Sequence, residues 1–266
     1  MRVFDLAWLA TAQVEHGFRP ISTTSLIILV GVTGVGKTTT VNAMRDAGIS
    51  FDLLPNRRTL TDDLIIAHLQ QMDGTPVERV TDRMARFAFT RRYRELYTGG
   101  MAHALAQLWV QNDQPLLFDG LRGVNEIEHA VAALPNANFL VLDAPHFVRL
   151  RRLLGRGDAF DAVGASSQTV SGNITQLSEL GVAGVDALFS AEQAAQLVQL
   201  VNSGQLAPDE LTSKLKIVSA ERANYDPAAT IKTLQQLAPD RTWLFDTNKL
   251  SPEEIAQQVQ KKAVSG

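Results

Sequence analysis

The apolar residues of the chain gather in five short, nearly continuous runs, and longer segments with helical spacing separate these runs. The runs occupy residues 25–30, 51–54, 115–120, 138–143 and 242–245. Apolar runs of this length between turn signals are typical of strands. Strands that alternate with helices predict an α/β chain.

The intervening segments predict helices, several of which carry capping signals. Predicted helices cover residues 4–13, 37–47, 77–96, 101–110, 145–155, 227–237 and 252–263. Ser190 to Gln193 reads as a capping box, as does Ser251 to Glu254, and Pro208 and Pro227 suit first helical positions. We expect one domain over 1–266, in which residues 158–224 form a helical insertion because the chain returns to a strand afterwards.

The first apolar run leads directly into a phosphate-binding pattern. Residues 31–38 match G-x-x-x-x-G-K-[ST] without a mismatch, and a helix pattern follows. Glycines let the backbone turn its N–H groups toward phosphate oxygens, and the helix N-terminus favours anions. The predicted nucleotide-binding residues are Gly31, Val32, Thr33, Gly34, Val35, Gly36, Lys37, Thr38 and Thr39. Lys37 is expected to reach the β- and γ-phosphates, and Thr38 to hold Mg²⁺.

Acidic residues near two other strands are candidates for the remaining chemistry. The third run ends in Asp119, and a strand that delivers an aspartate beside a phosphate loop is typical of phosphoryl-transfer sites that hold Mg²⁺. Asp52, in the second run, is a candidate proton acceptor if the phosphoryl acceptor is a hydroxyl; a strand-end cap is the alternative.

Arginines predict the recognition of anions. Arg57 and Arg58 follow the second run, where open α/β sheets bind ligands, and Arg122 follows Asp119. Arginine suits bidentate contacts with phosphate or carboxylate, although a solvated turn or a charged helix face stays an alternative. The predicted acceptor-binding residues are Arg57, Arg58, Arg83, Arg86 and Arg122. Arg152 and Arg156 follow the fourth run; Arg152 precedes a pair of glycines, and Arg156 lies between them. Arginines and glycines in this order are typical of a mobile segment that covers the phosphates. A plain surface helix is the alternative.

Composition narrows the function classes. The net charge is −3, from 25 basic and 28 acidic residues, so there is no overall basic footprint for nucleic acid. The absence of cysteine excludes disulfides, thiolate metal sites and cysteine nucleophiles. No apolar run approaches the length of a membrane span, and Asp5 interrupts the apolar start, so we expect a soluble, cytoplasmic protein.

This layout resembles the adenylate-kinase-like P-loop kinases of nucleotides and small molecules. The residues that carry the resemblance are 31–38, Phe118 to Arg122, Val141 to Arg156 and Phe245 to Glu254. The resemblance implies a three-layer fold with a five-stranded parallel sheet, an acceptor site on the helices after the second strand, an arginine-bearing lid, and a nucleotide base beside Asp246 to Lys249. The chain departs from the family in its Asp119-Gly120-Leu121-Arg122 segment, which is one residue shorter, and in the long insertion.

The leading hypothesis is an ATP- and Mg²⁺-dependent kinase that acts on a small anionic acceptor, such as a nucleotide or a phosphorylated metabolite. Lys37, Asp119, Arg152, Arg156 and Asp52 are its predicted catalytic residues, and Thr38 and Asp119 its metal ligands. An NTP-hydrolysing switch is the alternative, although Ser251 stands where guanine recognition requires an aspartate. A third class is a nucleotide-binding protein whose acidic insertion docks a partner.

Overall fold

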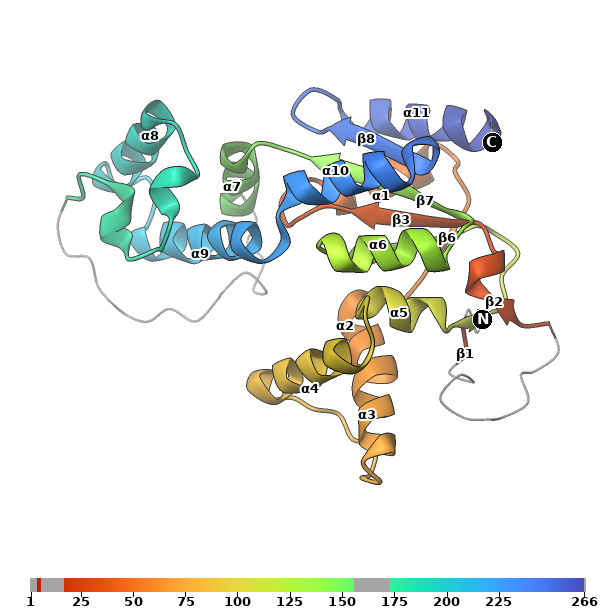
Figure 1. Cartoon of the computed structure of the whole chain (residues 1–266). Coiled ribbons are helices and arrows are strands. Elements are labelled where there is room, and N and C mark those ends of the chain that lie inside the picture. Colours follow the sequence, from red (N-terminus) through yellow and green to blue (C-terminus); the bar gives the residue numbers. More distant parts are fainter. Residues whose placement is uncertain (1–3, 6–16, 156–172, 266) are drawn as a thin grey trace.

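The computed structural model describes residues 4–5, 17–155 and 173–265 (Figure 1). Its centre is a parallel sheet of five strands in the order β4-β6-β3-β7-β8. The strands are β3 (Leu26–Val30), β4 (Asp52–Leu53), β6 (Leu116–Leu121), β7 (Ala137–Asp143) and β8 (Thr242–Asp246). Each lies within or overlaps a predicted apolar run, and the prediction of an α/β fold with a five-stranded parallel sheet is confirmed.

Alternate residues of the sheet pack into two separate cores. Ile27 and Leu29 of β3 face a layer formed by α1 (Lys37–Asp46) and α11 (Pro252–Ser265). Leu26, Ile28 and Val30 face the opposite layer, which contains α5 (Met101–Ala106), α6 (Val124–Ala133) and α10 (Pro227–Leu237). Successive side chains of a strand point to opposite faces, so both faces of this strand are buried and every position must be apolar.

A helical lobe follows β4 and packs beneath the sheet (Figure 1). It contains α2 (Arg57–Leu60), the π-helical turn η3 (Thr61–Ile66), α3 (Ala67–Met72) and α4 (Arg83–Leu96). The predicted helix at 77–96 begins six residues later because Asp82 caps it: its side chain accepts a hydrogen bond from the Ala85 N–H at 2.7 Å. Before the cap, both backbone groups of Glu78 bind the amide of Gln70, which holds the segment outside the helix.

Two further predicted helices are wrong in part. The helix expected at 101–110 ends at Ala106, and Trp109–Val110 form β5, which pairs with β1 (Phe4–Asp5) and β2 (Arg19–Pro20) in a small antiparallel sheet. The helix expected at 4–13 is replaced by β1 at Phe4–Asp5, and residues 6–13 lie outside the described residues. Strand pairing with Val110 explains both differences. The paired segments are short, and their sequences alone favour neither a helix nor a strand strongly.

The described part of the insertion is helical and packs on α7 (His146–Leu154). It contains η5 (Leu177–Leu180), η6 (Val185–Ala187), α8 (Ala191–Asn202) and α9 (Pro208–Tyr225). Leu150 and Leu153 of α7 share an apolar core with residues of all these elements, such as Leu215. The predicted capping box at Ser190 and the proline starts at Pro208 and Pro227 are confirmed. Residues 158–172 of the predicted insertion lie outside the described part of the chain.

Helix α9, the last element of the insertion, leads back toward the sheet, and its last turn lies beside the strand ends (Figure 1). Within the described residues, no helix combines the length and the apolar character that crossing a membrane requires.

Candidate functional site

The turn between β3 and α1 has the backbone that the phosphate-binding pattern requires. Gly31, Gly34 and Gly36 adopt φ values of 153°, 85° and 98°. Residues that carry a Cβ rarely adopt such positive φ values. A Cβ at Gly31 would lie 2.7 Å from the Leu142 carbonyl oxygen, and one at Gly34 would lie 3.0 Å from the Arg149 carbonyl oxygen. The loop therefore sits tightly between β7 and α7, while Val32 and Val35 anchor it in the core.

Lys37 and Asp119 meet at this loop, as predicted from the sequence. Lys37 opens α1, and its Nζ donates to the carbonyl oxygens of Gly31 at 2.8 Å and Val32 at 3.3 Å. The same Nζ lies 3.8 Å from Oδ1 of Asp119, near the end of β6. Strands β3 and β6 pair in parallel, with Leu29 opposite Asp119. This register brings the Asp119 carboxylate to the phosphate loop that follows β3. Thr38 and Thr39 lie on the first turn of α1, where both are exposed.

Burial and charge act on both groups. Burial lowers the pKa of Lys37, against the neighbouring charges of Asp119 and Glu221, which raise it. Burial likewise raises the pKa of Asp119, against the charges of Lys37 and Arg122, which lower it. The Asp119 side chain is 39% exposed, so its carboxylate remains accessible from the solvent side of the loop.

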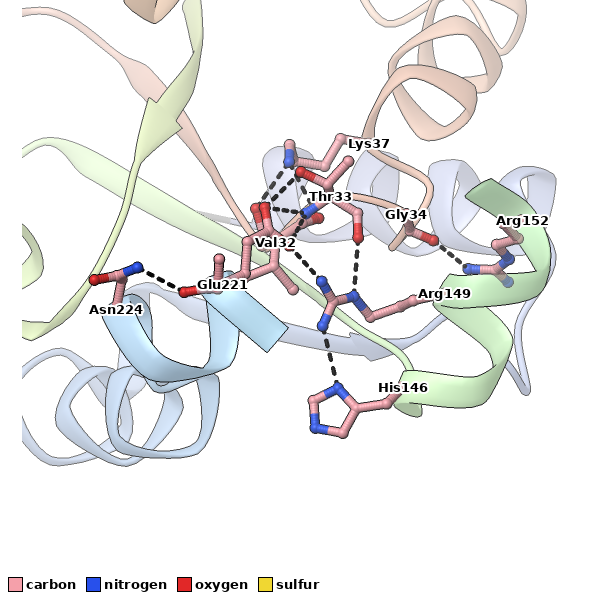
Figure 2. Close-up of polar contacts among 11 residues, drawn as sticks. Val32, Thr33, Gly34, Lys37, His146, Arg149, Arg152, Glu221 and Asn224 are labelled. Carbon is pink, nitrogen blue, oxygen red and sulfur yellow. Dashed lines mark hydrogen bonds and ion pairs between the residues drawn. The ribbon is translucent and has the colours of Figure 1, made fainter. Parts of the chain in front are cut away.

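Two arginines of α7 hold the outer side of the phosphate loop (Figure 2). Arg149 is 1% exposed, and its Nε donates to the Thr33 carbonyl oxygen at 2.9 Å. Arg152 donates to the Gly34 carbonyl oxygen at 3.3 Å and to Oγ1 and the carbonyl oxygen of Thr247 at 2.9 and 2.7 Å. Residues three apart share a helix face, which explains why both guanidiniums reach the same loop. Arg156, the other predicted arginine, lies outside the described residues.

Glu221 of α9 binds the loop from the insertion side, and the sequence pattern alone does not identify it (Figure 2). Its Oε1 accepts hydrogen bonds from the backbone N–H of Thr33 at 3.0 Å and from Thr33 Oγ1 at 2.5 Å. Its Oε2 accepts from Nη2 of Arg149, whose Nη1 lies 3.2 Å from Nδ1 of His146. Arg149 is one of several arginines along its helix, and the sequence does not single it out. No local pattern marks Glu221, because 188 residues separate it from Thr33.

Arg57, a predicted acceptor-binding residue, is engaged in an ion pair. Its Nη1 and Nη2 donate to the two carboxylate oxygens of buried Glu126 at 2.7 and 2.6 Å, and Nη1 also donates to the Gly120 carbonyl oxygen at 2.5 Å. Glu126 in addition accepts from the backbone N–H of Arg122 at 2.8 Å. These contacts hold the end of β6 in place. In this structure Arg57 therefore binds groups of the protein itself.

The other predicted acceptor-binding arginines are separated. Arg86 binds Oδ1 of Asp62 and the Val80 carbonyl oxygen, and so ties α4 to the turn η3. Arg58 is exposed on α2, and Arg83 opens α4. Arg122 is close to the loop: its charge acts on both Lys37 and Asp119, and its Cζ lies 5.5 Å from the centre of the Tyr225 ring.

The prediction that Asp52 accepts a proton at the site disagrees with the strand register. Asp52 pairs with Leu116 at the beginning of β6, three residues before Asp119. Three residues of strand span about 10 Å, so Asp52 lies toward the opposite end of the sheet from the phosphate loop. The short second strand ends at Leu53, and helix α2 begins before the chain reaches the level of the loop.

A cavity of about 300 Å³ lies beside the phosphate loop, on the α1 side. Gly36, Thr39, Arg152, Thr247 and Pro252 are among its lining residues. It therefore adjoins both the start of α1 and the chain after β8, where the resemblance implies a nucleotide base.

Comparison with known proteins gives similarities at low identity. No protein-family model matches the chain. A protein of Sulfurisphaera tokodaii described as a UPF0200 protein is 26% identical over 143 residues, which cover 54% of this chain and 72% of that protein.

Solved kinase structures align along most of the chain. An unliganded sugar kinase from Janibacter sp. HTCC2649 is 16% identical, with 91% of this chain and 95% of that chain covered and a TM-score of 0.40. Shikimate kinase from Bacteroides thetaiotaomicron is 14% identical, with 91% and 99% covered and a TM-score of 0.40. The P-loop fold itself is shown by the strand order and by the glycine-rich loop between β3 and α1.

Proposed function

We propose that this protein is a magnesium-dependent phosphotransferase that moves the terminal phosphoryl group of a nucleoside triphosphate, ATP in the leading hypothesis, to a small-molecule acceptor. The observation that carries the proposal is the meeting of Lys37 and Asp119, 3.8 Å apart, at a glycine-rich loop that opens a helix. A cation, a carboxylate and a cradle of backbone amides at one place are what phosphoryl transfer needs, because its catalysis is mainly positioning and charge stabilisation.

The chain's own groups divide the work of binding the triphosphate. Backbone N–H groups of the loop and the first turn of α1 receive phosphate oxygens. Lys37 then exchanges the Gly31 and Val32 carbonyl oxygens for phosphate. Arg152 lies between the loop and the cavity beside Thr247, and we assign the base of the nucleotide to that cavity. Arg152 and Arg149 add positive charge from α7, with Arg156 as a further candidate.

Thr38 and Asp119 fit a magnesium ion, since hydroxyl and carboxylate oxygens are ligands that Mg²⁺ prefers. Within the part of the chain that the structure describes, no group of three or more His, Cys, Asp or Glu side chains is arranged to hold a metal. The usual magnesium site of nucleotide-binding proteins combines one or two protein oxygens with substrate phosphates. When bound, the ion would neutralise charge on the phosphates.

The acceptor is assigned to the space between the phosphate loop and the end of β6. Arg122 is the candidate for positioning an anionic group of the acceptor, because it lines a small pocket together with Gly31 and Val32 of the loop. Arg57 and Arg86 bind carboxylates of the protein itself, so an acceptor would compete with Glu126 and Asp62 for them. The geometry thus favours a small acceptor with few negative charges over a multiply phosphorylated one.

An NTP-hydrolysing switch remains the second candidate, and one contact favours it. The insertion reaches the phosphate loop through Glu221, so occupation of the loop can be transmitted to a separate group of helices. The two candidates differ in the fate of the phosphoryl group. A switch releases inorganic phosphate with no added acceptor, whereas a phosphotransferase forms a phosphorylated product in equal amount to the diphosphate.

Phosphorus NMR tests the proposal. The protein is incubated with Mg-ATP and, in separate samples, with nucleosides, nucleotides, sugars and small hydroxy acids. We expect a new phosphoester signal with one acceptor class, and no turnover by the Lys37→Ala variant. Lys261→Ala, which changes an exposed lysine on α11, is the matched control and keeps full activity. Stoichiometric release of phosphate in every sample would overturn transfer in favour of hydrolysis.

A further inference from the structure

The carboxylate of Glu221 occupies an anion position of the phosphate loop. It accepts the backbone N–H of Thr33 through both oxygens, at 3.0 and 3.1 Å, and the Thr33 hydroxyl through Oε1. Backbone N–H groups in a loop of this kind are the groups that bind phosphate oxygens. An internal carboxylate on such a group therefore stands where a phosphate oxygen would bind.

The position belongs to the terminal end of a bound triphosphate. Lys37, which reaches the β- and γ-phosphates in loops of this pattern, rests its Nζ on the Gly31 and Val32 carbonyl oxygens. Thr33 is the next residue of the loop, and the charge of Glu221 acts on Lys37. The opposite end of the loop, at Gly36 and the start of α1, borders the cavity assigned to the base. Thr33 thus lies on the side away from the base.

Glu221 also holds an arginine that a phosphate could use. Arg149 donates Nη2 to Oε2 of Glu221, while its Nε donates separately to the Thr33 carbonyl oxygen at 2.9 Å. The second contact keeps the guanidinium on the loop if the first one breaks. Since Arg149 is 1% exposed, its charge needs an anionic partner, and either a carboxylate or a phosphate can serve.

We propose that Glu221 is the residue that distinguishes triphosphate from diphosphate in this site. The terminal phosphate displaces the Glu221 carboxylate and takes over the Thr33 N–H and Nη2 of Arg149, whereas a diphosphate leaves both contacts in place. Two anions cannot share these donors, because like charges at such a distance repel strongly. Displacement of Glu221 frees the last turn of α9, so only the triphosphate alters the attachment of the insertion. This inference rests on the proposed nucleotide binding at the loop.

Equilibrium titrations with Mg-ADP and with a non-hydrolysable Mg-ATP analogue test it in the Glu221→Gln variant. Glutamine keeps the size of the side chain and removes the competing charge. We expect affinity for the triphosphate analogue to rise about tenfold, equivalent to about 1.4 kcal/mol, and affinity for the diphosphate to change less than twofold. Glu210→Gln, an exposed position at the start of the same helix, serves as the matched control with no change in either affinity.

An unchanged ratio of the two affinities in Glu221→Gln, or weaker binding of the triphosphate analogue, overturns the inference. Because diphosphate binding to the unaltered protein is measured in the same series, failure of nucleotide binding at the loop is recognised separately. Hydrogen exchange on the unaltered protein gives a second test that needs no variant. The amides of residues 219–225 should exchange faster with the triphosphate analogue than with diphosphate; equal exchange with both nucleotides contradicts the proposal.

Discussion

Arg149 and Glu221 form an ion pair against the phosphate loop, although 72 residues of chain separate them. Both side chains are almost fully buried, with 1% and 8% exposed. Each also binds Thr33, Arg149 at the carbonyl oxygen and Glu221 at the N–H and the hydroxyl. The pair therefore links α7, α9 and the loop, and the stability of this region depends on it.

Removal of one partner of this pair should destabilise the fold strongly. Glu221→Ala leaves a buried guanidinium without its carboxylate, and loss of one member of a buried pair costs about 3–5 kcal/mol. The double variant Arg149→Met, Glu221→Leu should lose less, because no unpaired charge remains. Urea unfolding measures both, with Glu210→Ala as the exposed control. A Glu221→Ala variant as stable as the control would mean that the pair contributes nothing to the fold.

The sequence predicted the phosphate loop and the residues next to it, but it did not predict which distant residues bind the loop. The phosphate loop, Lys37 and Asp119 follow from one contiguous motif and one strand end, and the structure brings them together. Glu221 could not be identified in this way, because its position on the loop depends on how the insertion folds back. The burial of α9 on the core of the insertion, through Leu215 and Val218, creates that contact, and no short-range pattern encodes it.

The same limit explains the incorrect role for Asp52 and the reassignment of Arg57. The sequence shows that Asp52 lies in a strand, but only the register of β4 against β6 shows at which level. Arg57 was expected to meet an anion, and it does; the anion is Glu126, 69 residues later. In both cases the residue type predicted the kind of interaction, and tertiary packing decided the partner.

Gly34 is predicted to tolerate no side chain. Gly34→Ala imposes a Cβ on a φ of 85° and sets it 3.0 Å from the Arg149 carbonyl oxygen. Gly204 has a φ of 73°, and a Cβ added there would meet nothing within 4 Å, so Gly204→Ala isolates the backbone cost of about 1–2 kcal/mol. We expect Gly34→Ala to unfold at lower urea than Gly204→Ala and to bind Mg-ATP more weakly. Equal stability of the two variants would show that the loop can move away from α7.

The network around Glu126 should control the end of β6. Glu126→Gln breaks the charge pair with Arg57 and weakens the contact with the Arg122 N–H. We expect a loss of about 3 kcal/mol in unfolding free energy and a raised KM for the acceptor, because Arg122 is no longer held. Glu128→Gln, on the same helix, is the control. A stable Glu126→Gln variant with unchanged KM would contradict a positioning role for this network.

A cluster of histidines should make stability depend on pH. His103 lies 3.0 Å from the Tyr93 hydroxyl, and its ring centre is 5.5 Å from that of His129. Burial lowers the pKa of His103, and the charges of His129 and His68 lower it further; burial also lowers the pKa values of His68 and His129. The unfolded chain therefore binds more protons than the folded protein once the pH falls below about 6.5.

The contribution of these histidines to the unfolding free energy should consequently be constant well above this pH. It should decrease as the pH falls through the ordinary histidine pKa of about 6.5. Urea titrations at several pH values measure the effect. His103→Gln removes the central group, so its stability should fall less steeply over the same range than that of the unaltered protein. A stability that rises as the pH falls through this window would show that the folded cluster accepts protons readily.

Calorimetric titration of Mg-ATP into the unaltered protein and into Lys37→Ala determines where the nucleotide binds. If the loop of residues 31–38 holds the triphosphate, the unaltered protein binds one nucleotide per chain, and the variant loses at least about tenfold in affinity while its unfolding free energy stays the same. Equal affinities in two equally stable proteins would show that the nucleotide binds elsewhere, and would contradict the account.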